Sequence, residues 1–176
     1  MRLVSCFTAF LRNTVNINKS RLDTLTDAVE AIYAALLADE VIGHLILGKD
    51  PQGSWAHRTI IKPLPGNEFD ADFLLIFAEV PGWSPARYID EVYAALRRHS
   101  VYESMVLPPK RRCVRVVYTG DFHVDIVPFL DLSGRQVIVN HEEDDWEDTN
   151  PAGFTSWLHA RDTTAGDHLR EVIRLG

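Results

Sequence analysis

One nine-residue segment, Phe-Asp-Ala-Asp-Phe-Leu-Leu-Ile-Phe at residues 69–77, limits the fold of this chain more than any other. Its second half is apolar on both alternating faces, which is typical of a central strand covered on both sides. Asp70 and Asp72 lie two residues apart, so both carboxylates project from the same face, about 7 Å apart along the strand. Like charges at this spacing repel each other. The pair therefore predicts either a cation site or a strand face that is open to water.

A second apolar strand also carries a single acid. In His123-Val124-Asp125-Ile126-Val127-Pro128, alternation places His123 and Asp125 on one face. If this strand neighbours the first, three carboxylates converge, a donor set that suits Mg²⁺. Two such ions about 3.5–4 Å apart can activate an attacking hydroxyl and stabilise a leaving pyrophosphate. We expect His57 and His123 to have structural roles, with substrate contact as the alternative.

Gly53-Ser54 supplies a candidate phosphate site. The dipeptide follows a strand predicted at residues 41–48 and a turn predicted at residues 49–51. Glycine lets the backbone approach an anion closely, while backbone N–H groups and the serine hydroxyl can donate to it. Gly-Ser alone is common in turns. It becomes specific together with Thr59 and with an Asp-x-Asp pair that begins sixteen residues after Ser54.

The remaining pattern predicts an α+β domain, with a mixed or antiparallel sheet flanked by helices. Ser20 is the expected cap of a first long helix that ends near Asp39, after a helical or irregular lead-in at residues 1–17. Breakers at 63–66 are expected to end a short helical segment after Ser54. The other expected elements are a helix at 84–98, a hairpin of strands at 113–119 and 122–130, a strand at 136–139, a solvated acidic loop at 142–148, and helices starting near 151 and near 164 or 165.

Composition excludes several classes of protein. With 18 lysine and arginine residues against 25 acidic ones, the net charge of −7 makes long nucleic acid an unlikely ligand. Nucleotides remain candidate ligands, because a metal ion can screen the charge of their phosphates. The two cysteines, Cys6 and Cys113, indicate free thiols in a reducing compartment. No apolar run reaches the ~18 residues of a membrane span, so we expect a soluble cytoplasmic protein with no membrane partner.

The combined motif resembles that of a known superfamily. Gly-Ser-x4-Thr, then Asp-x-Asp, then a lone Asp in a later strand is the pattern of the DNA polymerase β-like nucleotidyltransferases. Within them, the stretches at 52–59, 69–75, 123–128 and 149–154 are similar to the bacterial CD-NTases. These are relatives of cGAS and oligoadenylate synthase that make cyclic oligonucleotide signals in antiphage defence. The resemblance covers nearly the whole chain.

The resemblance implies a role for each motif residue. Asp70 and Asp72 would bind two Mg²⁺ or Mn²⁺ ions, and Asp125 would bind the ion that activates the acceptor hydroxyl. Gly53 and Ser54 would hold the triphosphate of the incoming nucleotide, with Gln52 and Thr59 as further nucleotide-binding or phosphate-binding residues. A ribose hydroxyl would attack an α-phosphate, and pyrophosphate would leave. Nucleoside triphosphates are the implied partners, and a regulatory protein partner is compatible with this picture.

Two departures from the CD-NTase pattern stand out. Arg58 occupies the position before Thr59, where the family has glycine. The chain also has only the first turns of the helical second domain that the family carries. We therefore expect a nucleotidyltransferase palm at 1–162 and the start of a truncated helical domain at 163–176.

Two other functions remain open. One is a minimal nucleotidyltransferase that modifies RNA or protein, as in toxin–antitoxin pairs, which the short chain favours. The other is a truncated domain that binds nucleotide without catalysis. The basic loop at 110–112 is expected to be solvated, with phosphate contact as its alternative, and Trp55 is expected either to pack the turn or to stack on a base.

Overall fold

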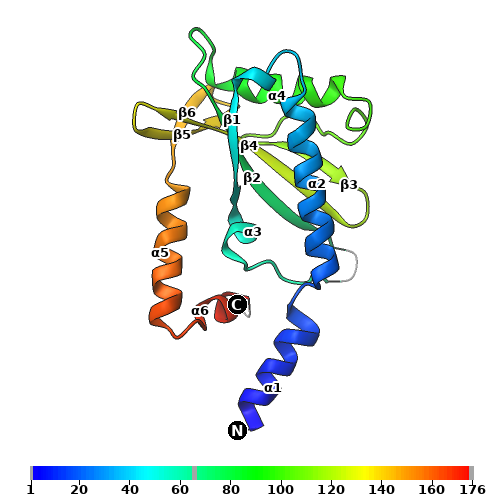
Figure 1. Cartoon of the computed structure of the whole chain (residues 1–176), viewed down its shortest axis with the longest axis vertical. Helices are drawn as coiled ribbons and strands as arrows, with labels where there is room; N and C mark the ends of the chain where they lie inside the picture. Colours follow the sequence, from blue (N-terminus) through cyan, green and yellow to red (C-terminus); the bar gives the residue numbers. More distant parts are fainter. Residues whose placement is uncertain (1, 65–66, 175–176) are drawn as a thin grey trace.

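A computed structural model describes residues 2–64 and 67–174 of the chain (Figure 1). Its centre is a mixed sheet in the order β1 (Ile46–Gln52), β2 (Phe69–Phe77), β4 (Phe122–Leu132), β5 (Arg135–Asn140), β6 (Asp145–Asp148). A further strand, β3 (Val114–Tyr118), pairs with the first half of β4, and β5 pairs with the second half. β2 and β4 are parallel, and the other pairs are antiparallel. The predicted α+β class and the central position of β2 are confirmed.

Helices cover one face of this sheet with the main core. α2 (Lys19–Leu37) and α4 (Pro85–Arg98) pack there against the odd-numbered residues of β2. The contacts come from alternating strand positions and from helix positions three or four residues apart, which are the two periodicities that the sequence displays. The buried side chains of this layer include Leu25, Val29, Ile32, Phe73, Leu75, Tyr88, Val92, Val124 and Ile126.

The opposite face of the sheet carries a smaller apolar cluster. Leu74 of β2, Val127 and Phe129 of β4, and Ile138 of β5 form it together with Cys113. Figure 1 shows α5 (Pro151–Thr164) standing beside the sheet, with α6 (Leu169–Ile173) folded back below it. The short η2 (Gly43–Leu45) precedes β1, and the short α3 (Gly53–His57) follows β1 directly. The N-terminal α1 (Arg2–Phe10) and η1 (Leu11–Val15) extend away from the sheet.

The strand predicted at residues 41–48 is wrong by about five residues. β1 begins at Ile46, because the Asp39 carboxylate accepts hydrogen bonds from the backbone N–H groups of Val41 (3.0 Å) and Ile42 (3.1 Å) and holds them in a turn. The turn predicted at residues 49–51 is wrong as well, since Pro51 lies within β1. β1 pairs only with β2 among the described residues, and an edge strand tolerates the missing N–H of proline.

The acidic segment at 142–148 is only partly the predicted solvated loop, because residues 142–144 form an exposed turn and residues 145–148 form the strand β6. β6 pairs with β5, and the Trp146 ring packs 5.6 Å from Tyr88 between ring centroids. Glu147 forms ion pairs with Arg111 and Arg112, so its charge is compensated within the fold. The Asp144 carboxylate accepts a 2.7 Å hydrogen bond from the backbone N–H of Ala86 in the first turn of α4. Pattern reasoning missed these long-range partners because they are far apart in the chain.

The helix termini also differ from expectation. Asn18 caps α2 in place of Ser20, accepting a 2.9 Å hydrogen bond from the Arg21 N–H. α5 continues to Thr164, so the helix predicted to start near 164 or 165 is α6, which begins at Leu169. The domain boundary expected after residue 162 falls within α5. Of the predicted breakers, Pro65 and Gly66 lie outside the described residues, as do residues 175–176 of the expected second domain.

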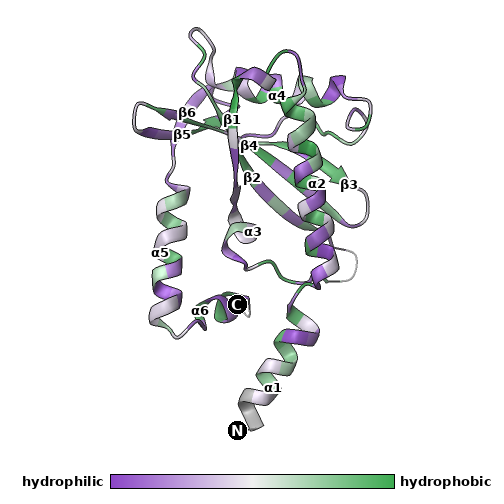
Figure 2. Ribbon diagram, in the orientation of Figure 1, coloured by the Kyte–Doolittle hydropathy of each residue, from purple (hydrophilic) through white to green (hydrophobic). Residues whose placement is uncertain are grey.

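Hydropathy follows the two-layer arrangement. Figure 2 shows hydrophilic bands crossing the otherwise apolar β2, and α5 is less uniformly apolar than the core strands. No helix within 2–64 and 67–174 combines the length and apolar character that crossing a membrane requires.

Candidate active site

The sheet brings the three predicted acids to one face. Asp70 and Asp72 alternate with the buried core residues of β2, so they lie on the face opposite α2 and α4. In the parallel β2–β4 pair, Asp72 is the register partner of Asp125, and Asp70 is the partner of His123. Register partners point to the same side of a sheet, with neighbouring strands about 4.8 Å apart. Asp125 therefore shares the face of the other two acids.

This crowding of negative charge perturbs Asp72. The pKa of its carboxyl group is raised to about 6. Burial is the largest cause, and the neighbouring negative charges of Asp70 and Asp125 add to it. Arg115 acts in the opposite direction but does not cancel the effect. A half-buried carboxylate with two like neighbours is short of positive charge, and a bound cation would supply it.

Asp125 is the acid of the three that already has a cationic partner. It is only 6% exposed, and both of its carboxylate oxygens accept hydrogen bonds of 2.6 Å from Arg115. Arg115 is the register partner of Asp125 in the antiparallel β3–β4 hairpin. The sequence analysis missed this arginine. Counting back from a two-residue turn at Gly120-Asp121 would have placed Val116 opposite Asp125. The observed register begins with Tyr118 opposite Phe122, so the connection has three residues and Arg115 takes that position.

The donor chemistry of this face fits a hard divalent cation. Carboxylate oxygens are the ligands that Mg²⁺ prefers, and the charge imbalance at Asp72 favours such an ion. Across the described parts of the chain, however, no three His, Cys, Asp or Glu side chains are already gathered as a metal cluster. The Arg115–Asp125 pair gives a physical reason, because it occupies the oxygens that Asp125 would offer.

The predicted Gly-Ser turn lies against the acids. Gln52 is the register partner of Asp72 across β1–β2, and its buried side-chain oxygen has no hydrogen-bond partner among the residues that the structure describes. Gly53 follows with φ of +63°, and a Cβ on it would lie 2.5 Å from the Oδ2 atom of Asp72. Only glycine permits both the left-handed backbone and this close approach.

Ser54 and Thr59 are joined by the backbone of this turn. The carbonyl oxygen of Ser54 accepts a 2.9 Å hydrogen bond from the N–H of Thr59. Both residues line a cavity of about 640 Å³ together with Asp70. Gln52, Gly53 and Asp72 line a separate, larger cleft. Arg58 closes α3 with φ of +57°, a conformation that glycine adopts without strain.

The larger cleft has a volume of about 1010 Å³ and runs from Asp72 along the second sheet face, whereas Asp70 lines the smaller cavity. Its floor is the apolar cluster that contains Leu74, Val127 and Phe129, and α5 forms its wall. Burial raises the pKa of the Cys113 thiol in this floor to about 12, and the nearby charge of Asp125 contributes, so the thiol is neutral. An apolar floor that ends at a carboxylate suits a ligand with a flat ring, whose anionic end would need a cation between itself and Asp72.

His57 and Trp55 have structural contacts. The His57 ring lies 3.2 Å from the Thr155 hydroxyl through Nε2 and packs edge-on against Phe154, so it joins α3 to α5. Burial, assisted by the charge of Arg170, lowers the pKa of His57, which keeps it neutral. Trp55 packs against the main core. His123 lies 3.4 Å from Glu68, and Arg111 and Arg112 of the basic loop are paired with Glu147.

The model of the Second Messenger Oligonucleotide or Dinucleotide Synthetase domain, SMODS, matches residues 1–162 of this chain. The chain belongs to the SMODS family. A curated relative, the "c-di-GMP synthase" of Roseivirga ehrenbergii, is 34% identical to this SMODS domain over 161 residues, a match that covers 85% of this chain and 41% of the relative. The expected family membership is confirmed.

Solved structures share the fold of this SMODS domain. The Bradyrhizobium diazoefficiens CD-NTase CdnG in complex with GTP matches with a TM-score of 0.75 and 22% identity, over 88% of this chain and 46% of that one. The CdnC:HORMA-deltaN complex of E. coli MS115-1 matches with a TM-score of 0.69 and 22% identity, over 99% and 54%. These matches confirm the expected nucleotidyltransferase fold. The chain spans only about half of each solved chain, and less than half of the curated relative.

Proposed function

We propose that this SMODS domain transfers nucleotidyl groups and joins nucleoside triphosphates into cyclic or linear oligonucleotides. The observation that carries the proposal is the face on which Asp70, Asp72 and Asp125 lie beside Gly53, at the end of an apolar cleft. Family membership and the name of the curated relative support it. The match to the family model ends at residue 162, which supports a catalytic unit at 1–162 followed by the start of a second unit.

Each part of the site has a role in this reaction. The open backbone at Gly53 and the hydroxyls of Ser54 and Thr59 hold the triphosphate, and Gln52 orients it. Asp70 and Asp72 would hold two divalent cations, and Asp125 would hold one of them, the ion that would activate the acceptor hydroxyl. When bound, Mg²⁺ or Mn²⁺ would neutralise phosphate charge and lower the pKa of the attacking hydroxyl. The chain itself supplies positioning, because in-line attack on the α-phosphate needs no covalent enzyme intermediate.

The biological setting is part of the proposal. An oligonucleotide messenger made from triphosphates fits a cytoplasmic enzyme of antiphage defence, where such a signal acts within the cell. The solved complex of CdnC with a HORMA protein supports a regulatory protein partner for a chain of this fold. The structure of CdnG with GTP supports a nucleoside triphosphate as the ligand.

The direct test is incubation with labelled ATP, GTP, CTP and UTP in the presence of Mg²⁺ or Mn²⁺, with this chain and with any longer product of its reading frame. We expect release of pyrophosphate and a labelled oligonucleotide, which resists phosphatase if it is cyclic. Asp72→Asn should abolish both. An exposed substitution of the same kind, Asp27→Asn on α2, should leave both unchanged.

Other outcomes separate the competing functions. Label that appears on RNA or protein would favour the minimal nucleotidyltransferase that modifies macromolecules. Nucleotide binding measured by calorimetry, without pyrophosphate release from any form of the protein, would favour the non-catalytic binding domain. Absence of both binding and product would contradict a nucleotidyltransferase altogether.

A further inference from the structure

The Arg115–Asp125 pair is geometrically the strongest contact at the acidic face. Two hydrogen bonds of 2.6 Å join the guanidinium Nε and Nη2 atoms to the two carboxylate oxygens. Such two-point pairs are strong and directional, because the planar fork of arginine matches the carboxylate. Backbone pairing of β3 with β4 holds the two residues opposite each other, so the contact does not depend on a mobile loop.

Because of this pair, the three acids differ in whether a positive charge compensates them. Among residues 2–64 and 67–174, no ion pair is formed by Asp70 or by Asp72, whereas Asp125 is neutralised and almost fully buried. A buried carboxylate without a counter-charge is strongly unfavourable. Arg115 therefore supplies at Asp125 the positive charge that a bound cation would otherwise supply.

We propose that Arg115 is a positioning residue that competes with divalent cations for Asp125, so that a cation ligates this carboxylate only as the guanidinium gives up part of its contact. The inference rests on the proposed function, because it takes the acidic face as the cation site. It adds a residue that the motif does not include. Its consequence is that Asp125 lies on the acidic face with both carboxylate oxygens bound to Arg115, and that Arg115 weakens cation binding by the metal-free protein.

The direction of the effect follows from charge and geometry. Arg115 fills the lone-pair positions between the two carboxylate oxygens, and its positive charge repels an approaching cation. Removing it leaves a buried, unpaired carboxylate beside Asp72, its register partner. The variant protein is then less stable without a cation and binds one more tightly.

The test is direct titration with Mn²⁺, followed by electron paramagnetic resonance of the free ion, with no nucleotide present. For Arg115→Met we expect the dissociation constant to fall about tenfold or more, since an opposite charge at this range shifts a carboxylate equilibrium by about 1–3 powers of ten. Mn²⁺ should also raise the melting temperature of Arg115→Met more than that of the wild type.

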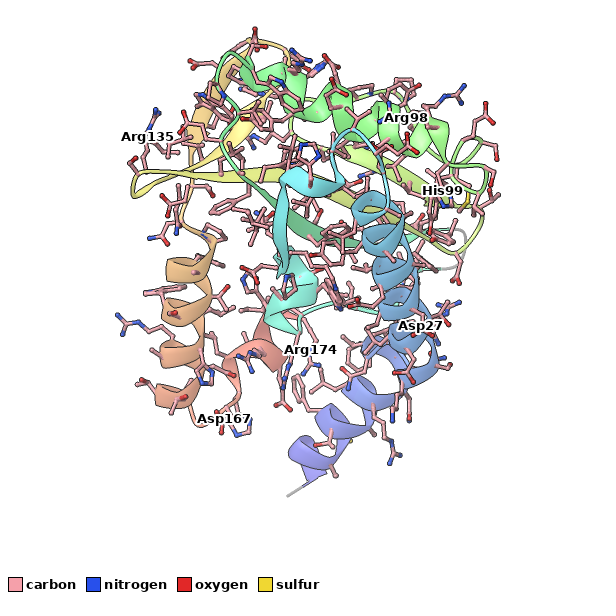
Figure 3. The ribbon with its side chains drawn as sticks, turned by 45° about the horizontal axis from the view of Figure 1, so that its top comes forward. Asp27, Arg98, His99, Arg135, Asp167 and Arg174 are labelled. Atoms are coloured by element: carbon pink, nitrogen blue, oxygen red, sulfur yellow. The ribbon has the colours of Figure 1, made fainter. Side chains whose placement is uncertain are left out.

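Arg98→Met is the matched control. Arg98 forms the same two-point contact with Asp39, at 3.0 and 2.8 Å, and Figure 3 shows it on α4, away from α3 and α5. This variant loses an equivalent ion pair, so its Mn²⁺ affinity should stay within about twofold of the wild type because the lost charge is screened from the site. If Arg115→Met binds Mn²⁺ no more tightly than Arg98→Met, the inference is overturned.

A second measurement covers the case in which Arg115→Met does not fold. In wild-type protein with ¹⁵N-labelled arginine, the Nε–H resonance of Arg115, assigned by its loss in Arg115→Lys, should shift when Mg²⁺ is added. An unmoved resonance at saturating Mg²⁺ overturns the inference while leaving the proposed function intact. If no form of the protein binds either ion, the metal-dependent function fails, and the role of Arg115 fails with it.

Discussion

Asp72 is a residue whose charge opposes folding. Its folded-state pKa is raised to about 6 from 3.8, by burial first and then by Asp70 and Asp125. Between these two values the folded chain binds more protons than the unfolded chain. Stability must therefore fall as pH rises from about 4 to about 6 and stay lower above that range.

Asp72→Asn should remove this pH-dependent loss. The full shift of about two units corresponds to roughly 3 kcal/mol, and solvent screening of a half-buried group reduces it to about 1–2 kcal/mol. We expect urea unfolding in EDTA to show the variant more stable than wild type by that amount at pH 8, and little different at pH 4.

The control for this prediction is Asp27→Asn. Asp27 lies exposed on α2 (Figure 3), so the same chemical change should alter stability by less than about 0.5 kcal/mol at either pH. An Asp72→Asn protein that is less stable than wild type at pH 8 would contradict the charge imbalance inferred at the site.

The element on which the cleft depends is α5. It is tied to α3 by the His57–Thr155 and His57–Phe154 contacts and to β5 by the hydrogen bond from the Thr149 N–H to the Gln136 carbonyl oxygen, and a side-chain cap begins the helix. The Asn150 side chain accepts a 2.8 Å hydrogen bond from the Gly153 N–H, and a Cβ at position 153 would lie 2.4–2.6 Å from that amide group. The cap therefore needs both residues.

Asn150→Ala should loosen α5 locally. Loss of an N-cap destabilises a helix by about 1 kcal/mol, so amide hydrogen exchange at the first turns of α5 should accelerate about fivefold. Asn18→Ala is the matched control, because Asn18 caps α2 through the same kind of bond, to Arg21. It should accelerate exchange at the start of α2 only. Unchanged exchange in α5 of Asn150→Ala would show that tertiary contacts alone hold that end.

For the whole molecule, the proposed cation site predicts a link between stability and cation binding. A ligand that binds only the folded state stabilises it by about 2.7 kcal/mol at a concentration of one hundred times its dissociation constant. Mn²⁺ should therefore raise the melting temperature by about 5–10 °C for a domain of this size. Asp70→Asn removes a ligand and should shrink the shift, which thermal unfolding monitored with and without EDTA would measure. A wild-type protein with no shift would lack the cation site.

Local periodicity predicted the strands and their acids well. The alternation in β2 is a property of nine consecutive residues, so it placed Asp70 and Asp72 on one face whatever the surroundings. The hairpin of β3 and β4 was equally local, because a tight turn joins its strands. Some wrong predictions had a local cause, because Asp39 delays the start of β1 and Asn18 caps α2. In two other cases, a distant partner had overridden the local pattern. Pro51 lies in a strand because β1 is an edge, and the acids of β6 are ordered by Arg111, Arg112 and the Trp146 packing.

The amino-acid sequence by itself determined that Asp70 and Asp72 share one strand face and that His123 and Asp125 share another, because side-chain type and strand alternation are encoded within a few neighbouring positions. Only the tertiary structure decided that β2 and β4 run side by side in parallel with Asp72 opposite Asp125, and that Asp125 is held by Arg115. Parallel strands are joined by a long crossover, here through α4 and β3, so their register follows from packing of the whole core and from no local turn.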